Sequence, residues 1–227
     1  MRRGLAILAA GSATRAGVDK VLADLGGQPV LAWSIAAGQA AQCFDDIVVV
    51  APKEKVAAFA KVAGGRARVV AGGDTRTASS WAALDALANA DLIAIHDAAR
   101  PFAPPSLYAR CLDVAASDGS AVAGLPLADT VRRADEAGAA TEELSREGLW
   151  SAQTPQTFRR DLLEQARAAA GDRTFSDDAA AVAAAGIAPK MVLGERRNLK
   201  ITTLEDLAYA RELVAKGLVG FPAMSVR

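Results

Sequence analysis

The hydrophobic positions along the chain fall into short, continuous apolar runs that are separated by longer segments with a helical period. Continuous apolar runs of about four to eight residues are typical of strands that are buried on both faces of a parallel sheet. Ile47–Val50 is the clearest of these runs. The predicted strands are Gly4–Ala9, Asp46–Ala51, Ala67–Ala71, Leu92–His96 and Ala121–Leu125, followed by a strand around Lys190–Leu193.

The segments between the predicted strands have the pattern of helices, and proline lies near the first turn of two of them, at Pro29 and Pro105. The predicted helices are Pro29–Cys43, Lys53–Ala63, Thr77–Asn89, Pro105–Ser117, Arg160–Ala170, Asp177–Ala185 and Thr203–Ala215. This alternation predicts an α/β fold, a Rossmann-like three-layer sandwich with a mostly parallel sheet. Ligands of such sheets bind beyond the carboxyl ends of the strands, so we expect the functional site there.

Two segments depart from this alternation. Asp129–Trp150 is charged and has few large apolar side chains, which fits either a solvated loop or a projecting arm that contacts another subunit. Gly217–Arg227 has no helical pattern, and we expect a tail or the start of a linker. The expected organisation is a single domain over residues 1–227, from which the arm at 129–150 projects.

The composition narrows the possible functions. Lys and Arg number 26, as do Asp and Glu, so the net charge of zero argues against an extended surface for nucleic acid or membrane. The apolar run Leu5–Ala10 is too short for a signal or membrane segment, and we expect a soluble, cytoplasmic protein. Cys43 and Cys111 have no metal-ligand spacing and the chain has one histidine, so we expect free thiols rather than a zinc site.

The segment after the first strand, Ala10–Lys20, has features of a phosphate-binding loop. Its small residues would let backbone amides approach a phosphate chain, and Arg15 and Lys20 add positive charge. Two familiar loops are excluded, because Val18 stands where a Walker A motif has lysine and Ala13 where a dinucleotide-binding loop has its second glycine. Alone, the segment would also fit a surface loop with solvated cations.

Two further polar segments follow predicted strands. In Gly72–Trp81, adjacent glycines permit close contact with a flat base, although the hydroxyls at the following helix start would also serve as N-caps. Asp97–Pro101 places an acid and a guanidinium just past a buried strand, where an aspartate suits a metal that bridges phosphates. Strand alternation points His96 away from Asp97, and we interpret it as a buried, hydrogen-bonded histidine.

Two later features carry positive charge. Arg159 and Arg160 begin a predicted helix, where each cation opposes the helix macrodipole by about 0.3–1 kcal/mol, so an anion there would explain them. Lys200 lies in a short strand-like stretch before the last predicted helix. Alone, Lys200 would be an ordinary surface lysine.

Together these segments resemble the 2-C-methyl-D-erythritol 4-phosphate cytidylyltransferases of the non-mevalonate isoprenoid pathway. The resemblance runs from Leu5 to about Leu213. Its most specific pieces are His96–Pro101, Gly148–Trp150 with Gln153–Gln156, and Asn198–Thr202. It implies an enzyme that transfers CMP from CTP to 2-C-methyl-D-erythritol 4-phosphate and releases pyrophosphate. The attacking phosphate monoester is already anionic, with a second pKa of about 6, so no general base is required.

The resemblance also implies roles for individual residues. Arg15 and Lys20 would stabilise the phosphates in the transition state, and Arg160 and Lys200 would position the acceptor phosphate. The family is dimeric, with an arm that reaches the neighbouring active site, so a homodimer through the 129–150 arm is expected. The residues implied in CTP binding are Ala9, Ala10, Gly11, Gly73, Asp74 and Ser79.

Asp97 and Arg100 would lie near the metal and the acceptor, with Asp97 as a ligand of Mg²⁺ or another divalent cation. Three positions depart from the family pattern: Ala13 replaces a glycine, Asp19 a proline, and Glu143 a threonine of the arm that contacts the substrate. Since a carboxylate would repel a phosphate there, a cytidylyltransferase for another polyol phosphate, such as ribitol 5-phosphate, stays open.

Two other classes of protein are also open. The first is an NAD(P)-dependent oxidoreductase on a Rossmann sheet, against which the missing GxGxxG motif argues. The second is a nucleotide-binding module without catalytic activity, against which the presence of both Arg15 and Lys20 argues.

Overall fold

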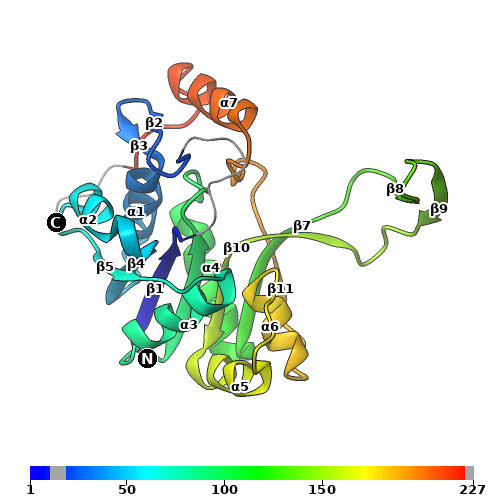
Figure 1. Cartoon of the computed structure of the whole chain (residues 1–227), viewed down its shortest axis with the longest axis horizontal. Coiled ribbons are helices and arrows are strands. Elements are labelled where there is room, and N and C mark those ends of the chain that lie inside the picture. The colour runs from blue at the N-terminus through cyan, green and yellow to red at the C-terminus, as the bar shows by residue number, and fades with distance from the viewer. Residues whose placement is uncertain (11–18, 223–227) are drawn as a thin grey trace.

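The computed structural model of the chain describes residues 1–10 and 19–222, and a central sheet dominates it (Figure 1). In this part of the chain the sheet has seven strands in the order β11-β7-β10-β6-β1-β4-β5. The strands are β1 (Arg3–Leu8), β4 (Asp46–Ala51), β5 (Arg68–Ala71), β6 (Leu92–Asp97), β7 (Ser120–Pro126), β10 (Trp150–Arg159) and β11 (Met191–Leu193).

The sheet is mostly parallel, which confirms the predicted α/β class. β1 pairs in parallel with β4 and β6, and β5 and β11 extend the parallel pairing at the two edges. The exception is β10, which is antiparallel to both β6 and β7. The sequence did not predict this strand because Pro155 interrupts it, and the register with β7 shifts between Ala152 and Gln156 to accommodate the irregularity.

Helices cover both faces of the sheet. Alternate side chains of β1 and β4 point to opposite faces, so Leu8 and Val50 join one apolar cluster while Ile7 and Val49 join the other. One face is covered by α3 (Arg76–Ala86), α5 (Arg160–Ala170) and α6 (Asp178–Ala184), and the other by α1 (Val30–Ala40), α2 (Val56–Ala63) and α4 (Pro105–Asp118). The 3₁₀ turn η2 (Lys53–Lys55) precedes α2. These layers confirm the predicted sandwich.

A smaller cluster lies beyond the carboxyl ends of the strands, where α7 (Leu204–Ala215) packs near the short hairpin of β2 (Asp24–Leu25) and β3 (Gln28–Pro29) (Figure 1). Trp33 is at its centre, and its indole donates to the Leu25 carbonyl at 2.7 Å. Phe221 packs edge-on against Trp33 with ring centroids 5.1 Å apart. The described part of the predicted tail, residues 217–222, is therefore anchored by this contact.

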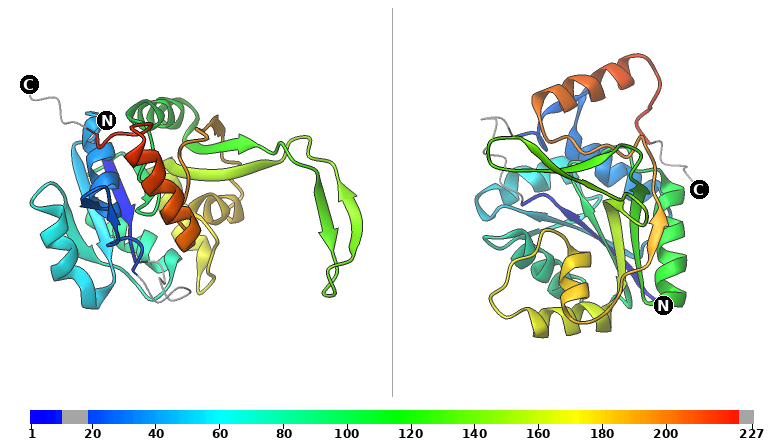
Figure 2. Two further views of the ribbon diagram at one scale, coloured as in Figure 1. Left: turned by 90° about the horizontal axis from the view of Figure 1, so that it is seen from above. Right: turned by 90° about the vertical axis from the view of Figure 1, so that its right-hand side faces the viewer.

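The charged segment 129–150 contains a hairpin of β8 (Val131–Ala134) and β9 (Ala140–Leu144), which projects away from the sheet and its helices (Figure 2). Two cross-strand ion pairs link its strands. Arg132 lies 2.8 Å from Glu143, and Arg133 lies 3.1 Å from Glu142. Of the two interpretations of this segment, the structure has the projecting hairpin. Among the described helices, none is both long and apolar enough to cross a membrane.

Candidate functional site

The candidate site is centred on the carboxylate of Asp97, the last residue of β6. Lys200 Nζ lies 2.7 Å from this carboxylate, Arg100 Nε lies 3.8 Å away and Arg76 lies 3.9 Å away. Burial alone would raise the pKa of Asp97, but the charges of Lys200, Arg76 and Arg100 outweigh it and hold the pKa below its usual range. Three cations share two carboxylates here, since Arg76 also lies 2.6 Å from Asp178, so one positive charge is left over and favours an anionic ligand.

The turn that follows Asp97 is fixed by hydrogen bonds to neighbouring elements. The Arg100 amide donates to the Asp97 carbonyl at 3.0 Å, which closes the turn. The Ala98 amide donates to the Leu8 carbonyl at 2.9 Å, and the Ala98 carbonyl accepts from the buried Ser34 hydroxyl at 2.8 Å. Because each group of the turn is bound by a different part of the fold, Asp97 and Arg100 keep a fixed relative position.

Lys20 and Lys200 lie on two segments that meet at this edge of the sheet. Lys20 Nζ donates to the carbonyl of Thr202, two residues after Lys200. Asn198 is fully buried, and its side-chain amide donates to the Thr154 carbonyl at 2.8 Å. This hydrogen bond fixes the segment that carries Lys200. The structure thus brings together Lys20, Lys200, Asp97 and Arg100, which the sequence had placed in separate segments.

Arg76 is a cation of this group that the sequence analysis missed. It is the first residue of α3, and its guanidinium lies 2.6 Å from the buried carboxylate of Asp178. Burial would lower the pKa of Arg76, but Asp178 and Asp97 outweigh it and raise the pKa. The signal was present, since Arg76 lies in the polar segment after β5, but its partner Asp178 is on α6 and no local pattern connects them.

The glycine-bearing segment after β5 lies against the end of β1. A side chain at Gly72 would place its Cβ 2.9 Å from Ala10 Cβ and 2.7 Å from Ser79 Oγ, so only glycine fits this contact. Ser79 donates to the Thr75 carbonyl at 2.9 Å in the first turn of α3. Ala9, Ala10, Gly73 and Ser79 are therefore grouped at the carboxyl edge. Asp74 is beside them but is exposed and pairs with Lys53 at 3.4 Å.

His96 is fully buried and hydrogen-bonded on both ring nitrogens, as the sequence predicted. Nε2 lies 3.0 Å from the Arg100 carbonyl, and Nδ1 lies 3.1 Å from the Thr154 hydroxyl. Burial lowers the pKa of His96 to about 4, so the ring is neutral near neutral pH. Its place beneath the turn, rather than at the surface of the site, separates it from any ligand.

Arg160 is not brought to this group. It follows β10, whose residue Arg159 pairs with Leu92 at the start of β6, so Arg160 lies at the amino edge of the sheet, roughly 16 Å along the strand from Asp97. Its guanidinium donates to the Ala90 carbonyl at 2.8 Å and to the carbonyls of Leu84 and Leu87, close to the end of α3. No bound anion is needed to explain this arginine, because backbone carbonyls and the Glu164 carboxylate, 3.2 Å away, already bind it.

Two predicted residues, Gly11 and Arg15, lie outside the residues that the structure describes. For a divalent cation, the relevant group is Asp97. Within residues 1–10 and 19–222, no cluster of three or more His, Cys, Asp or Glu side chains could hold a metal by itself. Mg²⁺ is often bound by one or two carboxylates together with substrate phosphates, and the ionised Asp97 fits that mode rather than an all-protein cage.

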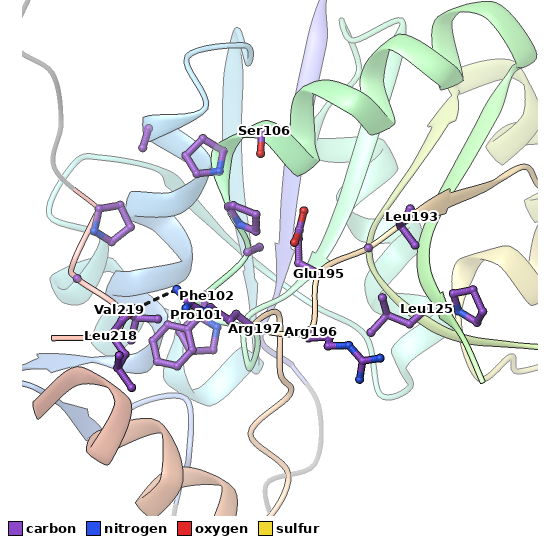
Figure 3. Close-up of a pocket in the computed structure, with 18 of the residues that line it drawn as sticks. Pro101, Phe102, Ser106, Leu125, Leu193, Glu195, Arg196, Arg197, Leu218 and Val219 are labelled. Carbon is purple, nitrogen blue, oxygen red and sulfur yellow. Dashed lines mark hydrogen bonds between the residues drawn. The ribbon is translucent and has the colours of Figure 1, made fainter. Parts of the chain in front are cut away.

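A cavity of 1220 Å³ lies near this edge, between the start of α4, the end of β7 and the segment that precedes α7 (Figure 3). Arg197 donates to the Leu218 carbonyl at 3.2 Å at its rim. Among described residues, its lining includes Pro101 and Phe102 but neither Asp97 nor Lys200. The cavity is thus adjacent to the cation group and distinct from it.

Comparison with known proteins identifies relatives over nearly the whole chain. A family model described as 2-C-methyl-D-erythritol 4-phosphate cytidylyltransferase matches residues 4–216. The enzyme of that name from Deinococcus radiodurans is 43% identical over 93% of this chain and 89% of its own length. A bifunctional enzyme IspD/IspF from an Anaeromyxobacter species is 46% identical over 93% of this chain, and the chain spans only 57% of that protein.

Solved structures agree with the sequence matches. The 2-C-methyl-D-erythritol 4-phosphate cytidylyltransferase of Thermus thermophilus superimposes with a TM-score of 0.78 at 33% identity, over 94% of this chain and 98% of that one. The 4-diphosphocytidyl-2C-methyl-D-erythritol synthase of Anaerococcus prevotii gives a TM-score of 0.81 at 26% identity, over 93% and 97% of the two chains.

Proposed function

Because the chain belongs to the 2-C-methyl-D-erythritol 4-phosphate cytidylyltransferase family, we propose that it transfers CMP from CTP to 2-C-methyl-D-erythritol 4-phosphate in isoprenoid precursor biosynthesis. The products are 4-diphosphocytidyl-2-C-methyl-D-erythritol and pyrophosphate. The observation that carries this proposal is the group of Lys20, Arg76, Arg100 and Lys200 around Asp97 at the carboxyl edge of the sheet.

The proposed reaction is a displacement at phosphorus. An oxygen of the acceptor's phosphate monoester attacks the α-phosphorus of CTP, the bond to the oxygen that bridges the α- and β-phosphates breaks, and pyrophosphate leaves. The attacking oxygen is already anionic near neutral pH, so His96 has no proton to remove. The main barrier is to bring two polyanions together in line, which fixed cations in a water-poor site can lower.

The proposed roles follow the positions of the side chains. Lys20, with Arg15, stabilises the charge that develops on the phosphates of CTP. Lys200 and Arg100 bind the acceptor phosphate, and Arg76 holds the far side of Asp97. The residues proposed to hold the nucleotide are Ala9, Ala10, Gly11, Gly73, Asp74 and Ser79.

Asp97 is the residue proposed to hold Mg²⁺. The ion would neutralise charge on the phosphates of bound CTP. The low pKa of Asp97 supports this assignment, because the carboxylate is ionised near neutral pH. Lys200, which lies 2.7 Å from Asp97, limits the room on one side of the carboxylate and orients it.

The most specific element of the proposal is which polyol phosphate accepts CMP. Glu143 replaces the family's threonine in the arm, and its charge would oppose a phosphate. In this chain, however, Arg132 lies 2.8 Å from Glu143 and offsets that charge. The pairing supports the erythritol phosphate as acceptor, and ribitol 5-phosphate is the comparison substrate.

We also propose a cytoplasmic homodimer that forms through the 129–150 arm. The hairpin projects from the body, and two exposed leucines near its base support a contact with a second copy: Leu149 is 39% exposed and Leu193 is 60% exposed. Light scattering on the purified chain should give a dimer mass. A variant with residues 130–147 replaced by a short glycine linker should be monomeric, and a dimer in that variant would contradict the proposal.

The function is tested by pyrophosphate release with CTP and Mg²⁺, in parallel reactions with 2-C-methyl-D-erythritol 4-phosphate and with ribitol 5-phosphate. Turnover of the erythritol phosphate alone is the expected result. Turnover of ribitol phosphate instead would retain the nucleotide half of the site and reject the acceptor assignment. Absence of turnover with both would reject the proposed function.

A further inference from the structure

We propose that Thr154, together with the ring of His96, is a positioning residue that sets the Asp97–Arg100 turn for the reaction. Neither residue faces the proposed substrates. The inference deepens the proposed function and rests on it for the activity measurements, whereas the hydrogen-bond pattern on which it is built can be tested without any substrate.

The two residues close a continuous chain of hydrogen bonds beneath the turn. The Asp97 amide donates to Thr154 Oγ1 at 3.0 Å, and this oxygen lies 3.1 Å from His96 Nδ1. On the other side of the ring, His96 Nε2 lies 3.0 Å from the Arg100 carbonyl. The first and last residues of the turn are therefore tied through one imidazole ring.

The direction of each hydrogen bond follows from the partners. A carbonyl oxygen only accepts, so Nε2 carries the proton and donates to Arg100. Nδ1 then accepts from the Thr154 hydroxyl at 3.1 Å, because the other contact of that oxygen is with a donor, the Asp97 amide. The same hydroxyl oxygen accepts from the Asp97 amide, which leaves each of the three groups satisfied. Only a hydroxyl can both accept from an amide and donate to an imidazole at this position.

The consequence for Asp97 is a fixed backbone at the point where its carboxylate leaves the strand. β6 ends at Asp97, so no following strand residue holds this amide, and the Thr154 hydroxyl on the adjacent β10 takes that role. Because Lys200, Arg76 and Arg100 all lie within 4 Å of the carboxylate, a small rotation of the Asp97 backbone changes every one of these distances. Loss of the hydroxyl is thus expected to affect the rate more than the overall stability.

β10 itself provides a matched control. Thr157 lies three residues further along the strand and is buried like Thr154, but its hydroxyl has no hydrogen-bond partner. Replacement of either threonine by valine keeps the size and β-branching and removes one buried hydroxyl. The two variants therefore differ mainly in whether the lost hydroxyl was engaged with the turn.

The test compares Thr154→Val, Thr154→Ser and Thr157→Val. For Thr154→Val we expect kcat and kcat/KM to fall together by about 10- to 100-fold, the size of effect that follows a misplacement of about 1 Å. Thr154→Ser retains the hydroxyl and should recover most of the rate, and Thr157→Val should keep the wild-type rate. Equal rates in the two valine variants would overturn the proposal, as would a serine variant no better than valine.

A second measurement needs no activity and holds even where Thr154→Val does not fold. His96 is the single histidine of the chain, so ¹⁵N-histidine labelling gives the signals of one ring, one from Nδ1 and one from Nε2. In the wild-type protein near neutral pH we expect the proton on Nε2 and an unprotonated Nδ1 that accepts a hydrogen bond. The opposite tautomer would overturn the proposal. If wild type turns over neither acceptor, the proposed function fails, while this tautomer still decides the inference.

Discussion

The two edges of the sheet treat positively charged residues in opposite ways. At the carboxyl edge, Lys200, Arg100 and Arg76 surround the carboxylate of Asp97, and positive charge is left over for a ligand even though Arg76 also pairs with Asp178. At the amino edge, Arg160 donates to backbone carbonyls near the end of α3, and its charge is used within the fold. A cation that lies at the carboxyl edge beside a carboxylate can therefore bind a ligand. A cation at the amino edge that donates to backbone carbonyls stabilises the fold instead.

The strongest test of this contrast is Lys20→Ala, for which we expect turnover to fall by about 10²–10³ because a fixed cation at the phosphates is removed. The fold should remain intact, since the Lys20 ammonium contacts the Thr202 carbonyl and no buried group is exposed. Steady-state kinetics and thermal unfolding measure the two effects. Lys190→Ala, which removes an exposed lysine paired with Asp118, is the control. Similar rates in both variants would remove Lys20 from the mechanism.

Arg76→Met should affect both stability and rate. Removal of one partner of a buried ion pair costs about 3–5 kcal/mol, and we expect the lower end because Arg76 is a quarter exposed. Denaturant unfolding checks this value. The double variant Arg76→Met/Asp178→Ala should recover much of the stability but little of the turnover. Full recovery of turnover in the double variant would show that Arg76 acts only on the fold.

Arg160→Ala sharpens the comparison from the other edge. The carbonyls near the end of α3 lose a charged donor, and we expect the free energy of unfolding to fall by about 1–3 kcal/mol. Below the melting temperature, kcat and the KM for the acceptor should stay near the wild-type values. A large rise in the acceptor KM in a folded variant would return Arg160 to the acceptor site, as the family resemblance implies.

The smallest effect is expected in the arm. Glu143→Thr removes an ion pair with Arg132 in which both side chains are more than half exposed, so the free energy of unfolding should change by less than about 1 kcal/mol. Thermal unfolding checks this expectation, and Glu142→Thr on the same strand is the control. A loss well above that of Glu142→Thr would mean that the pair with Arg132 matters to the fold.

Much of the fold could be predicted because its signals are local. The apolar run of β4 and the periodicity of α5 gave bounds that the structure reproduces, Asp46–Ala51 and Arg160–Ala170. β10 was missed because Pro155 lies within it, and that omission explains the treatment of Arg160. A helix that follows a parallel strand begins at the carboxyl edge of the sheet. A helix that follows an antiparallel strand such as β10 begins at the amino edge. Without β10, the edge on which Arg160 lies could not be assigned.

The candidate site was also predictable only where its signals are local. Asp97 and Arg100 follow a predicted strand directly, Lys20 ends the polar segment after the first predicted strand, and the rule that ligands bind at carboxyl ends groups them. Arg76 and Thr154 could not be assigned from local patterns, because their partners are on other elements. Asp178 is on α6, more than a hundred residues from Arg76, and Thr154 meets Asp97 only through the antiparallel register of β10 with β6.

The course of β10 from the arm to α5 has a mechanical consequence. The strand begins at Trp150, where the arm returns to the body, passes Thr154 beneath the Asp97 turn and ends at Arg159 beside α5. Its ladder to β7 holds at Trp150–Ala152 and again at Gln156–Phe158, and the shifted register lies between these two stretches. A pull on the arm is therefore resisted first by the pairing of Trp150–Ala152 with β7, and only beyond that stretch does it reach the Thr154 hydroxyl that binds the Asp97 turn.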